Sequence, residues 1–209
     1  MHRSIRLLKH LNLNSKEYSL KNIVIFILLM NLTKLKEKYK EKDLITFGLT
    51  IKQSFKEDIN LWKKDLVLPN GWIKLKLDNK SLNNSGNALG MLTGKINNIF
   101  VVDVDDLDDW LFLLKKTGNK EPKTVKAISG SGGFHFYFKY TDRLKDITSK
   151  DRAICYDDKV LKIDVKSNGG FIIVAPSSYY NENLKTDVEY KWVTGQSIFE
   201  HDLLELPYW

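Results

Sequence analysis

The sequence is poor in cysteine, histidine and long apolar runs, and each shortage excludes a class of protein. Its 209 residues include one cysteine, Cys155, which excludes a disulfide-stapled fold and a cysteine-rich zinc site. The four histidines are scattered, which excludes a histidine-cluster metal site. The nearly continuous apolar run at 23–32 is about half of the roughly 20 residues that a membrane-spanning helix needs. We therefore expect no stable membrane insertion.

What the sequence does contain is typical of a folded, basic protein. Hydrophobic residues make up 43% of the chain and aromatic residues 11%, which argues against disorder. The length suits one compact domain, or one domain with a small appendage. The 33 Lys and Arg against 26 Asp and Glu give a net charge of +7. This excess permits a nucleic-acid or phosphate partner without demanding one, because a generally solvated lysine surface explains it equally well.

Residues 1–32 differ from the rest and form an N-terminal extension. A basic, polar stretch at 1–22 precedes the apolar run at 23–32. This order resembles a signal peptide, but the polar leader is long and the following residues make a poor cleavage site. Met30 offers an alternative start, in which case the upstream part is not native. A packed N-terminal helix or strand, or a membrane association, are the other interpretations.

Residues 33–209 read as one α/β domain without repeats or a long linker. The apolar spacing predicts an exposed helix at 32–43 and a short helix at 55–64 that carries Trp62. Turn and loop residues lie at 69–71, 81–87 and 94–98. The remaining early elements are predicted strands at 44–51 and 88–93.

The segment 99–106 reads as a buried strand that ends in acidic residues. It is apolar on both faces at first, and then Asp103 and Asp105 follow at i and i+2, on one face. Two adjacent carboxylates repel each other, so both stay ionised only if cations lie between them. Hard divalent ions such as Mg²⁺ take oxygen ligands of this kind. Asp106 reads instead as the N-cap of a helix at 107–116.

Two further strands carry polar residues on one face. The strand at 134–140 places phenylalanines on one face and His135, Tyr137 and Lys139 on the other. The glycine-rich segment 129–133 precedes it, and glycine backbone N–H groups can approach and bind an anion. The strand at 161–166 alternates apolar residues with Lys162, Asp164 and Lys166, and a buried strand at 171–175 follows.

If these strands are neighbours in one sheet, their polar faces converge. The shared face then holds three carboxylates, one histidine and one or two lysines, an inventory that suits two divalent cations and a triphosphate. Such cations activate a 3′-hydroxyl and stabilise the leaving pyrophosphate in an in-line displacement. His135 and Lys166 would neutralise phosphate charge.

The order of short motifs along the chain carries a resemblance. The motifs are, in order, Asn87-x-x-Gly90-x-x-Thr93-Gly94, Asp103-Val-Asp105, Ser131-Gly-Gly-Phe-His135, Ile163-Asp-Val-Lys166, Gly169-Gly170, Val174-Ala-Pro-Ser-Ser178, Tyr190-x-Trp192 and Leu206-Pro-x-Trp209. In combination they resemble the bifunctional DNA primase/polymerase (prim-pol) domain of the archaeo-eukaryotic primase superfamily, over residues 44–209.

The resemblance implies a fold and a set of site residues. The fold would be α/β (α+β), the primase core in which an N-terminal αβ unit packs on an RRM-like mixed sheet, and it would occupy 33–209. Asp103, Asp105 and Asp164 match the family's metal-binding triad, which would bind Mg²⁺ or Mn²⁺. His135 matches the histidine that contacts the phosphates of the incoming nucleotide.

The resemblance also places a loop and a lysine near those phosphates. Ser131, Gly132 and Gly133 belong to the family's Ser-Gly-Gly-x-His form, and Lys166 fits the basic position that often follows the third acid. The reaction would be template-directed nucleotidyl transfer on single-stranded DNA with nucleoside triphosphates. Such domains are frequent in plasmids, phages and large DNA viruses, where a separate chain would supply the replicative helicase.

The sequence departs from the family in ways that leave initiation open. The segment from Lys52 to Trp62 matches the family's usual N-terminal motif only loosely, and no zinc-binding module is visible. De novo priming is therefore less certain than extension. Two other functions stay open: a non-catalytic module that binds single-stranded nucleic acid, and a metal-dependent nuclease or phosphohydrolase, since acidic clusters serve those enzymes too.

Overall fold

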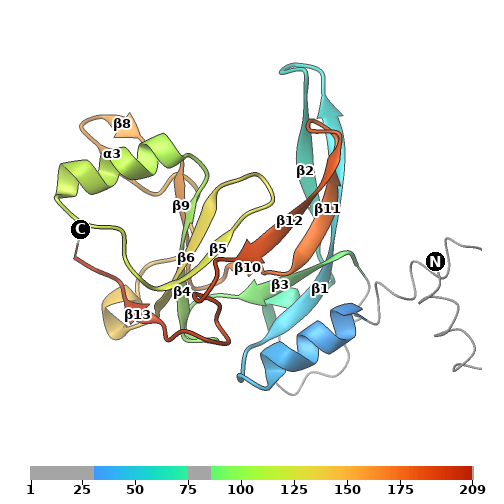
Figure 1. Cartoon of the computed structure of the whole chain (residues 1–209), viewed down its shortest axis with the longest axis horizontal. Coiled ribbons are helices and arrows are strands. Elements are labelled where there is room, and N and C mark those ends of the chain that lie inside the picture. Colours follow the sequence, from blue (N-terminus) through green and yellow to red (C-terminus); the bar gives the residue numbers. More distant parts are fainter. Residues whose placement is uncertain (1–30, 75–85, 209) are drawn as a thin grey trace, which may run out of the picture.

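The structure is a computed structural model that describes residues 31–74 and 86–208. Within these ranges, most strands belong to two sheets that share a buried core, and Figure 1 shows their arrangement. The N-terminal extension lies almost wholly outside the described residues, as does most of the predicted loop at 81–87. The division of the chain at residue 32 therefore stays a prediction. No helix of the described part is both long and apolar enough to cross a bilayer.

The first sheet is antiparallel throughout, with the strand order β10-β3-β1-β2. Its strands are β10 (Phe171–Ile173), β3 (Ala88–Leu92), β1 (Thr46–Lys56) and β2 (Leu61–Val67). The strands predicted at 44–51, 88–93 and 171–175 are thus confirmed. Every residue of β3 is buried, as expected for a central strand whose two faces are both covered.

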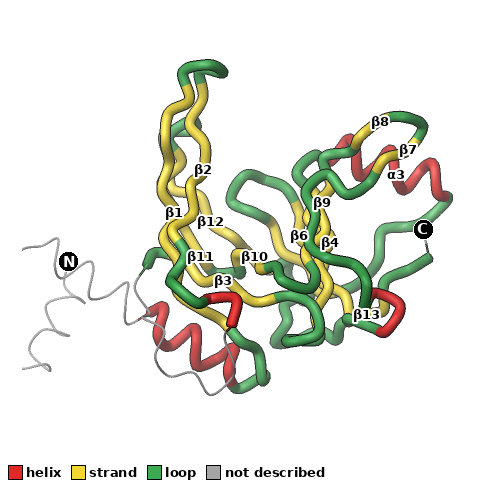
Figure 2. The backbone as a smooth tube through the Cα atoms, turned by 180° about the vertical axis from the view of Figure 1, so that it is seen from behind, coloured by secondary structure: helices red, strands yellow, loops and turns green. Residues whose placement is uncertain are grey.

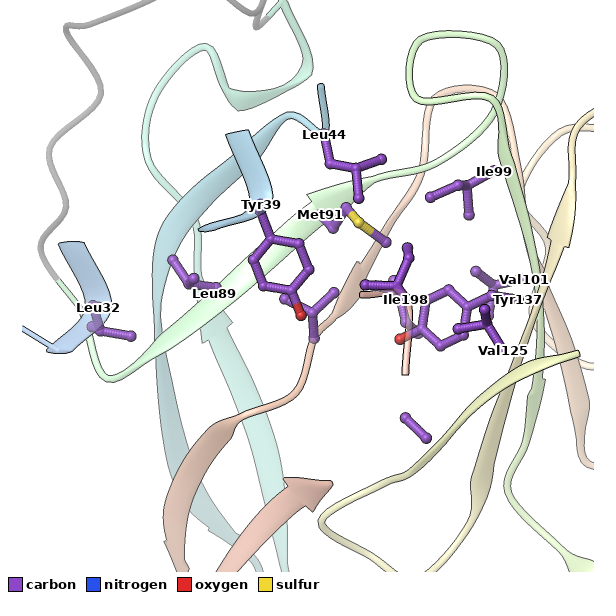
Figure 3. Close-up of a cluster of buried hydrophobic side chains, with 13 residues drawn as sticks. Leu32, Tyr39, Leu44, Leu89, Met91, Ile99, Val101, Val125, Tyr137 and Ile198 are labelled. Atoms are coloured by element: carbon purple, nitrogen blue, oxygen red, sulfur yellow. The ribbon is translucent and has the colours of Figure 1, made fainter. Parts of the chain in front are cut away.

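A helix at residues 31–40 covers one face of this sheet (Figure 1). Leu32 and Tyr39 are buried, and the Tyr39 hydroxyl donates a hydrogen bond to the carbonyl of Ala175. Figure 3 shows these side chains in a cluster with Met91 of the first sheet and Val101 of the second. The predicted helix is confirmed, and its apolar stripe joins the two sheets rather than facing solvent.

The helix predicted at 55–64 is wrong, because this segment forms the end of a long β-hairpin. β1 and β2 pair from Thr50 opposite Val67 to Lys56 opposite Leu61. A turn at 57–60 closes the hairpin, and Asn60 adopts a positive φ of 51°, which asparagine tolerates well. Trp62 pairs across the strands with Phe55, with ring centroids 5.6 Å apart. Figure 2 shows this hairpin extending away from the rest of the molecule.

The second sheet is larger, with the order β11-β12-β5-β6-β4-β9, and β13 pairs in parallel with the end of β6. Its strands are β4 (Ile99–Val104), β5 (Val125–Ile128), β6 (Phe134–Lys139), β9 (Ile163–Lys166), β11 (Ser177–Asn181), β12 (Thr186–Trp192) and β13 (Leu204–Glu205). The strands predicted at 99–106, 134–140 and 161–166 are confirmed.

Helix α3 (Leu107–Thr117) packs on one face of this sheet. The Asp106 side chain accepts hydrogen bonds from the backbone N–H groups of Asp108 and Asp109, and Gly118 ends the helix with a φ of 69°. The predicted N-cap is confirmed, and Gly118 is the C-terminal cap. The ring of Trp110 stacks on Phe136, with centroids 4.7 Å apart.

The other face of β4 and β6 is covered by the first sheet, so Tyr137 is fully buried rather than solvated. Asp103 and His135 lie on this second face, at the end of β4 where the two sheets diverge into a cleft. The short elements η1 (Trp72–Lys74), η2 (Asp142–Leu144), β7 (Cys155–Tyr156) and β8 (Lys159–Val160) connect the strands. The mixed α+β architecture expected from the sequence is confirmed.

Candidate active site

Strand register sets two acidic residues and a histidine in one row across the second sheet. Asp103 of β4 lies directly opposite Asp164 of β9 on one side and His135 of β6 on the other. Directly opposite residues project from the same face with Cβ atoms about 4.5–5.5 Å apart. The row therefore brings together side chains that are 61 residues apart in sequence, as the alternation along each strand predicted.

Asp105 joins this row from the end of β4. Its backbone N–H donates a hydrogen bond to the carbonyl of Lys162, at 3.0 Å. It lines a cleft of about 290 Å³ together with Asp103. The polar residues that line the cleft are Lys64, Asp103, Asp105, Ser129, Ser131, His135, Ser149, Lys166 and Tyr190.

Asp164 is held by a lysine and a backbone amide. One of its carboxylate oxygens lies 2.8 Å from the Lys166 ammonium, and the other accepts the N–H of Arg152 at 2.7 Å. Lys166 makes a second ion pair of 2.8 Å with Asp151. Although burial opposes it, these hydrogen bonds to Asp151 and Asp164 raise the pKa of Lys166. Lys166 is therefore a charged bridge between two carboxylates.

Burial perturbs the two carboxyl groups at the end of β4. It raises the pKa of Asp103 to about 6, and the charge of Asp164 adds to this rise while Lys166 and Lys64 oppose it. The pKa of Asp105 is raised for the same reasons, first by burial and then by the charges of Asp103 and Asp164. The cluster thus holds more negative charge than its lysines offset, which is a setting that favours a bound cation.

His135 is a buried, neutral imidazole in this structure. Burial lowers its pKa to about 3, and its Nε2 lies 3.3 Å from an Asp103 carboxylate oxygen. Its Nδ1 is buried without a hydrogen-bond partner among the described residues. The role of this residue toward phosphate charge stays a prediction.

The predicted anion-binding segment is a tight turn between β5 and β6. The Ser129 N–H donates to the Gly133 carbonyl at 2.8 Å, and the Gly133 N–H donates to the Ser129 hydroxyl at 3.0 Å. The Ser131 hydroxyl lies 3.2 Å from that of Ser129, and both line the cleft. Gly132 has a φ of +90°, and a Cβ on Gly133 would lie 2.3 Å from the Val104 carbonyl. Both positions therefore require glycine.

The opposite wall of the cleft comes from the first sheet and its hairpin, and the sequence alone did not point to it. Trp72 and Phe171 meet edge to face with centroids 4.9 Å apart, and Leu66 lies beside them in the lining. Lys64 reaches the cleft from β2, and its ammonium lies 3.3 Å from the Tyr190 hydroxyl. Only Tyr190 carried an earlier signal, as part of a motif in the resemblance.

The carboxylate oxygens of Asp103, Asp105 and Asp164 are ligands that suit a hard divalent cation. The nearby lysines do not offset all of their negative charge. In its present arrangement, the described part of the chain contains no group of three His, Cys, Asp or Glu side chains close enough to hold an ion together. The reason lies at Asp164, whose two oxygens contact Lys166 and the Arg152 amide. Asp103 and Asp105 are free of such ion pairs with lysine in the described residues.

A known protein family matches most of the chain. The family model described as "Bifunctional DNA primase/polymerase, N-terminal" matches residues 51–209, which include the second half of β1, all strands from β2 through β13 and every residue of the cleft named above. A search of curated proteins found no match to this chain.

Proposed function

Because the chain belongs to the bifunctional DNA primase/polymerase family, we propose that its cleft catalyses template-directed nucleotidyl transfer in DNA replication. The observation that carries the proposal is the register of β9, β4 and β6, which sets Asp164, Asp103 and His135 side by side in one row, of which Asp103 and His135 line the cleft. The family's DNA template and nucleoside triphosphates are the corresponding substrates.

The proposed reaction joins a 3′-hydroxyl to a nucleotide. The hydroxyl oxygen bonds to the α-phosphorus, the bond from that phosphorus to the bridging oxygen of the pyrophosphate breaks, and the hydroxyl proton is lost. Negative charge grows on the attacking and leaving oxygens, and two Mg²⁺ or Mn²⁺ ions would stabilise it when bound. Asp103, Asp105 and Asp164 are the residues that would hold these ions.

The protein's own groups position the nucleotide. The Ser129 and Ser131 hydroxyls line the cleft, where they can donate hydrogen bonds to phosphate oxygens, whereas the N–H groups of Gly132 and Gly133 already donate to Ser129 within the turn. His135 is fixed by Asp103, and it is the histidine that the resemblance places against the phosphates. On the other wall, Trp72 and Phe171 offer an apolar surface that suits the base and sugar.

Primer extension on a single-stranded template tests the proposal. We expect labelled primer to lengthen with Mg²⁺ or Mn²⁺ and all activity to stop with a chelator. Asp103→Asn or Asp105→Asn should lower the rate by several orders of magnitude, because metal charge stabilisation is worth several kcal/mol. Asp108→Asn, at an exposed position in the first turn of α3, is the matched control and should keep full activity.

Two further assays, of DNA cleavage and of DNA binding, distinguish the competing functions. Cleavage of single-stranded DNA with Mn²⁺ and no nucleotides would identify a nuclease instead. DNA binding that weakens with salt, with no metal-dependent nucleotide binding, would identify a non-catalytic module. Replication of a mobile element or a large DNA virus, with a separate helicase, is the biological setting that the resemblance implies.

A further inference from the structure

Two lysines line the cleft, and their surroundings differ. Lys166 contacts two carboxylates, Asp151 and Asp164, each at 2.8 Å. Lys64 makes no ion pair with a carboxylate within 4.0 Å in the described ranges, although its charge acts on the pKa of both Asp103 and Asp105. Lys64 is therefore the lysine of the cleft whose charge no close carboxylate offsets.

The hairpin directs Lys64 into the cleft. Side chains alternate along β2, so Trp62, Lys64 and Leu66 share one face, and both Lys64 and Leu66 line the cleft. Lys63 projects from the opposite, exposed face. The position of Lys64 thus follows from the strand, which replaces the helix predicted for this segment.

Tyr190 holds the end of the Lys64 side chain. Its hydroxyl lies 3.3 Å from the Lys64 ammonium, and that ammonium lies 5.9 Å from the centre of the Tyr190 ring. Tyr190 itself is buried in the core beside Tyr179 and so has a fixed position. An ammonium group has three N–H donors. One is directed to Tyr190, so two remain for an acceptor in the cleft.

We propose that Lys64, delivered by the β1–β2 hairpin and positioned by Tyr190, binds the triphosphate of the incoming nucleotide. The proposal rests on the proposed function. A triphosphate enters a cleft that already holds the carboxylates of Asp103 and Asp105, and Lys166 is occupied by its own partners. Phosphate oxygens accept strong charge-assisted hydrogen bonds from an ammonium group. Lys64 supplies that charge from the wall opposite the acidic row.

The test is the affinity for a nucleoside triphosphate, measured by calorimetry with Mg²⁺. Lys64→Ala should weaken binding about 10- to 100-fold, the loss expected for one charge-assisted hydrogen bond. Lys64→Arg should restore most of the affinity, and the matched control Lys63→Ala should bind as the wild type does. The corresponding nucleoside monophosphate, which has less phosphate charge, should lose less affinity than the triphosphate.

A second variant tests the positioning residue. Tyr190→Phe keeps the buried ring and removes the hydroxyl, so we expect a loss of triphosphate affinity smaller than that of Lys64→Ala. In extension assays both variants should raise KM for the nucleotide more than they lower kcat. Circular dichroism should show that each variant is folded.

The outcomes separate this inference from the proposed function. If the wild-type protein binds no nucleoside triphosphate with Mg²⁺, the proposed function fails. If the wild type binds and Lys64→Ala binds equally well, the function stands and the role of Lys64 is wrong. Weaker binding of single-stranded DNA by Lys64→Ala, with unchanged triphosphate affinity, would also overturn it, because the lysine would then contact the template.

Discussion

Replacing Asp103 by asparagine should stabilise the metal-free protein while it removes activity. Burial raises the pKa of Asp103 from its ordinary value of 3.8 to about 6, so the folded protein holds this proton more tightly than the unfolded chain does. Each pKa unit corresponds to about 1.4 kcal/mol at 25 °C, and the ionised carboxylate therefore costs about 3 kcal/mol of folding free energy at pH 7. Asparagine is neutral and close to aspartate in size, so it fits the same place beside His135.

The sign of the effect depends on pH. Well below pH 3.8 the Asp103 carboxyl is protonated in both the folded and the unfolded states, so it does not lower the stability of the wild type. As the pH rises from about 4 to 6, the unfolded chain releases the proton first, and the stability of the wild type falls. The difference in unfolding free energy between Asp103→Asn and wild type should therefore be small at pH 4 and reach about 3 kcal/mol at pH 8.

Urea unfolding with a chelator present, at pH 4.5, 6 and 8, measures this difference. A change of about 3 kcal/mol corresponds to a melting temperature about 6–12 °C higher for a chain of this size. Asp58→Asn, at the exposed turn of the hairpin, is the control and should change stability by less than about 0.5 kcal/mol. An Asp103→Asn protein no more stable than wild type at pH 8 would refute the reasoning, because the carboxylate would then carry no desolvation cost.

Two further substitutions test the packing around the site. Tyr137→Phe should raise the unfolding free energy by about 1 kcal/mol, because the buried hydroxyl has no hydrogen-bond partner in the described part of the chain; a loss of stability in urea unfolding would reveal a missing partner. Gly133→Ala should lower it by about 1–3 kcal/mol, because the new methyl group would meet the Val104 carbonyl, a backbone atom of the neighbouring strand. An unchanged melting temperature for Gly133→Ala would contradict the close approach of the turn to β4.

The strand face on which each residue of the acidic row lies was predictable from the sequence, because it depends on local rules. Alternation along a strand fixed which side chains share a face, and the apolar runs identified β4, β6 and β9 as buried strands. The cap residues Asp106 and Gly118 likewise act within one or two turns of α3. The pairing of β4 with β6 and β9, which brings these faces together, depends instead on partners that are distant in sequence, and the sequence analysis could only assume it.

The opposite wall could not be predicted in this way. The segment around Phe55 and Trp62 is rich in charge, and its turn contains no glycine, so nothing local indicated a hairpin. Its strand pairing and the position of Lys64 depend on contacts with β12, more than 120 residues away. The partner of Lys166, Asp151, lies in a loop whose position only the tertiary structure reveals. The resemblance pointed to Lys166 as a basic residue near the phosphates, which stays a prediction, and Lys64 is the lysine that our proposal adds.

A crystal structure with Mn²⁺ and a non-hydrolysable nucleoside triphosphate tests the central claim most directly, because Mn²⁺ is located by its anomalous scattering. The account predicts Mn²⁺ bound by carboxylate oxygens of Asp103 and Asp105, with Asp164 contributing and the triphosphate between this row and Lys64. Mn²⁺ bound elsewhere, or a nucleotide outside this cleft, would contradict it.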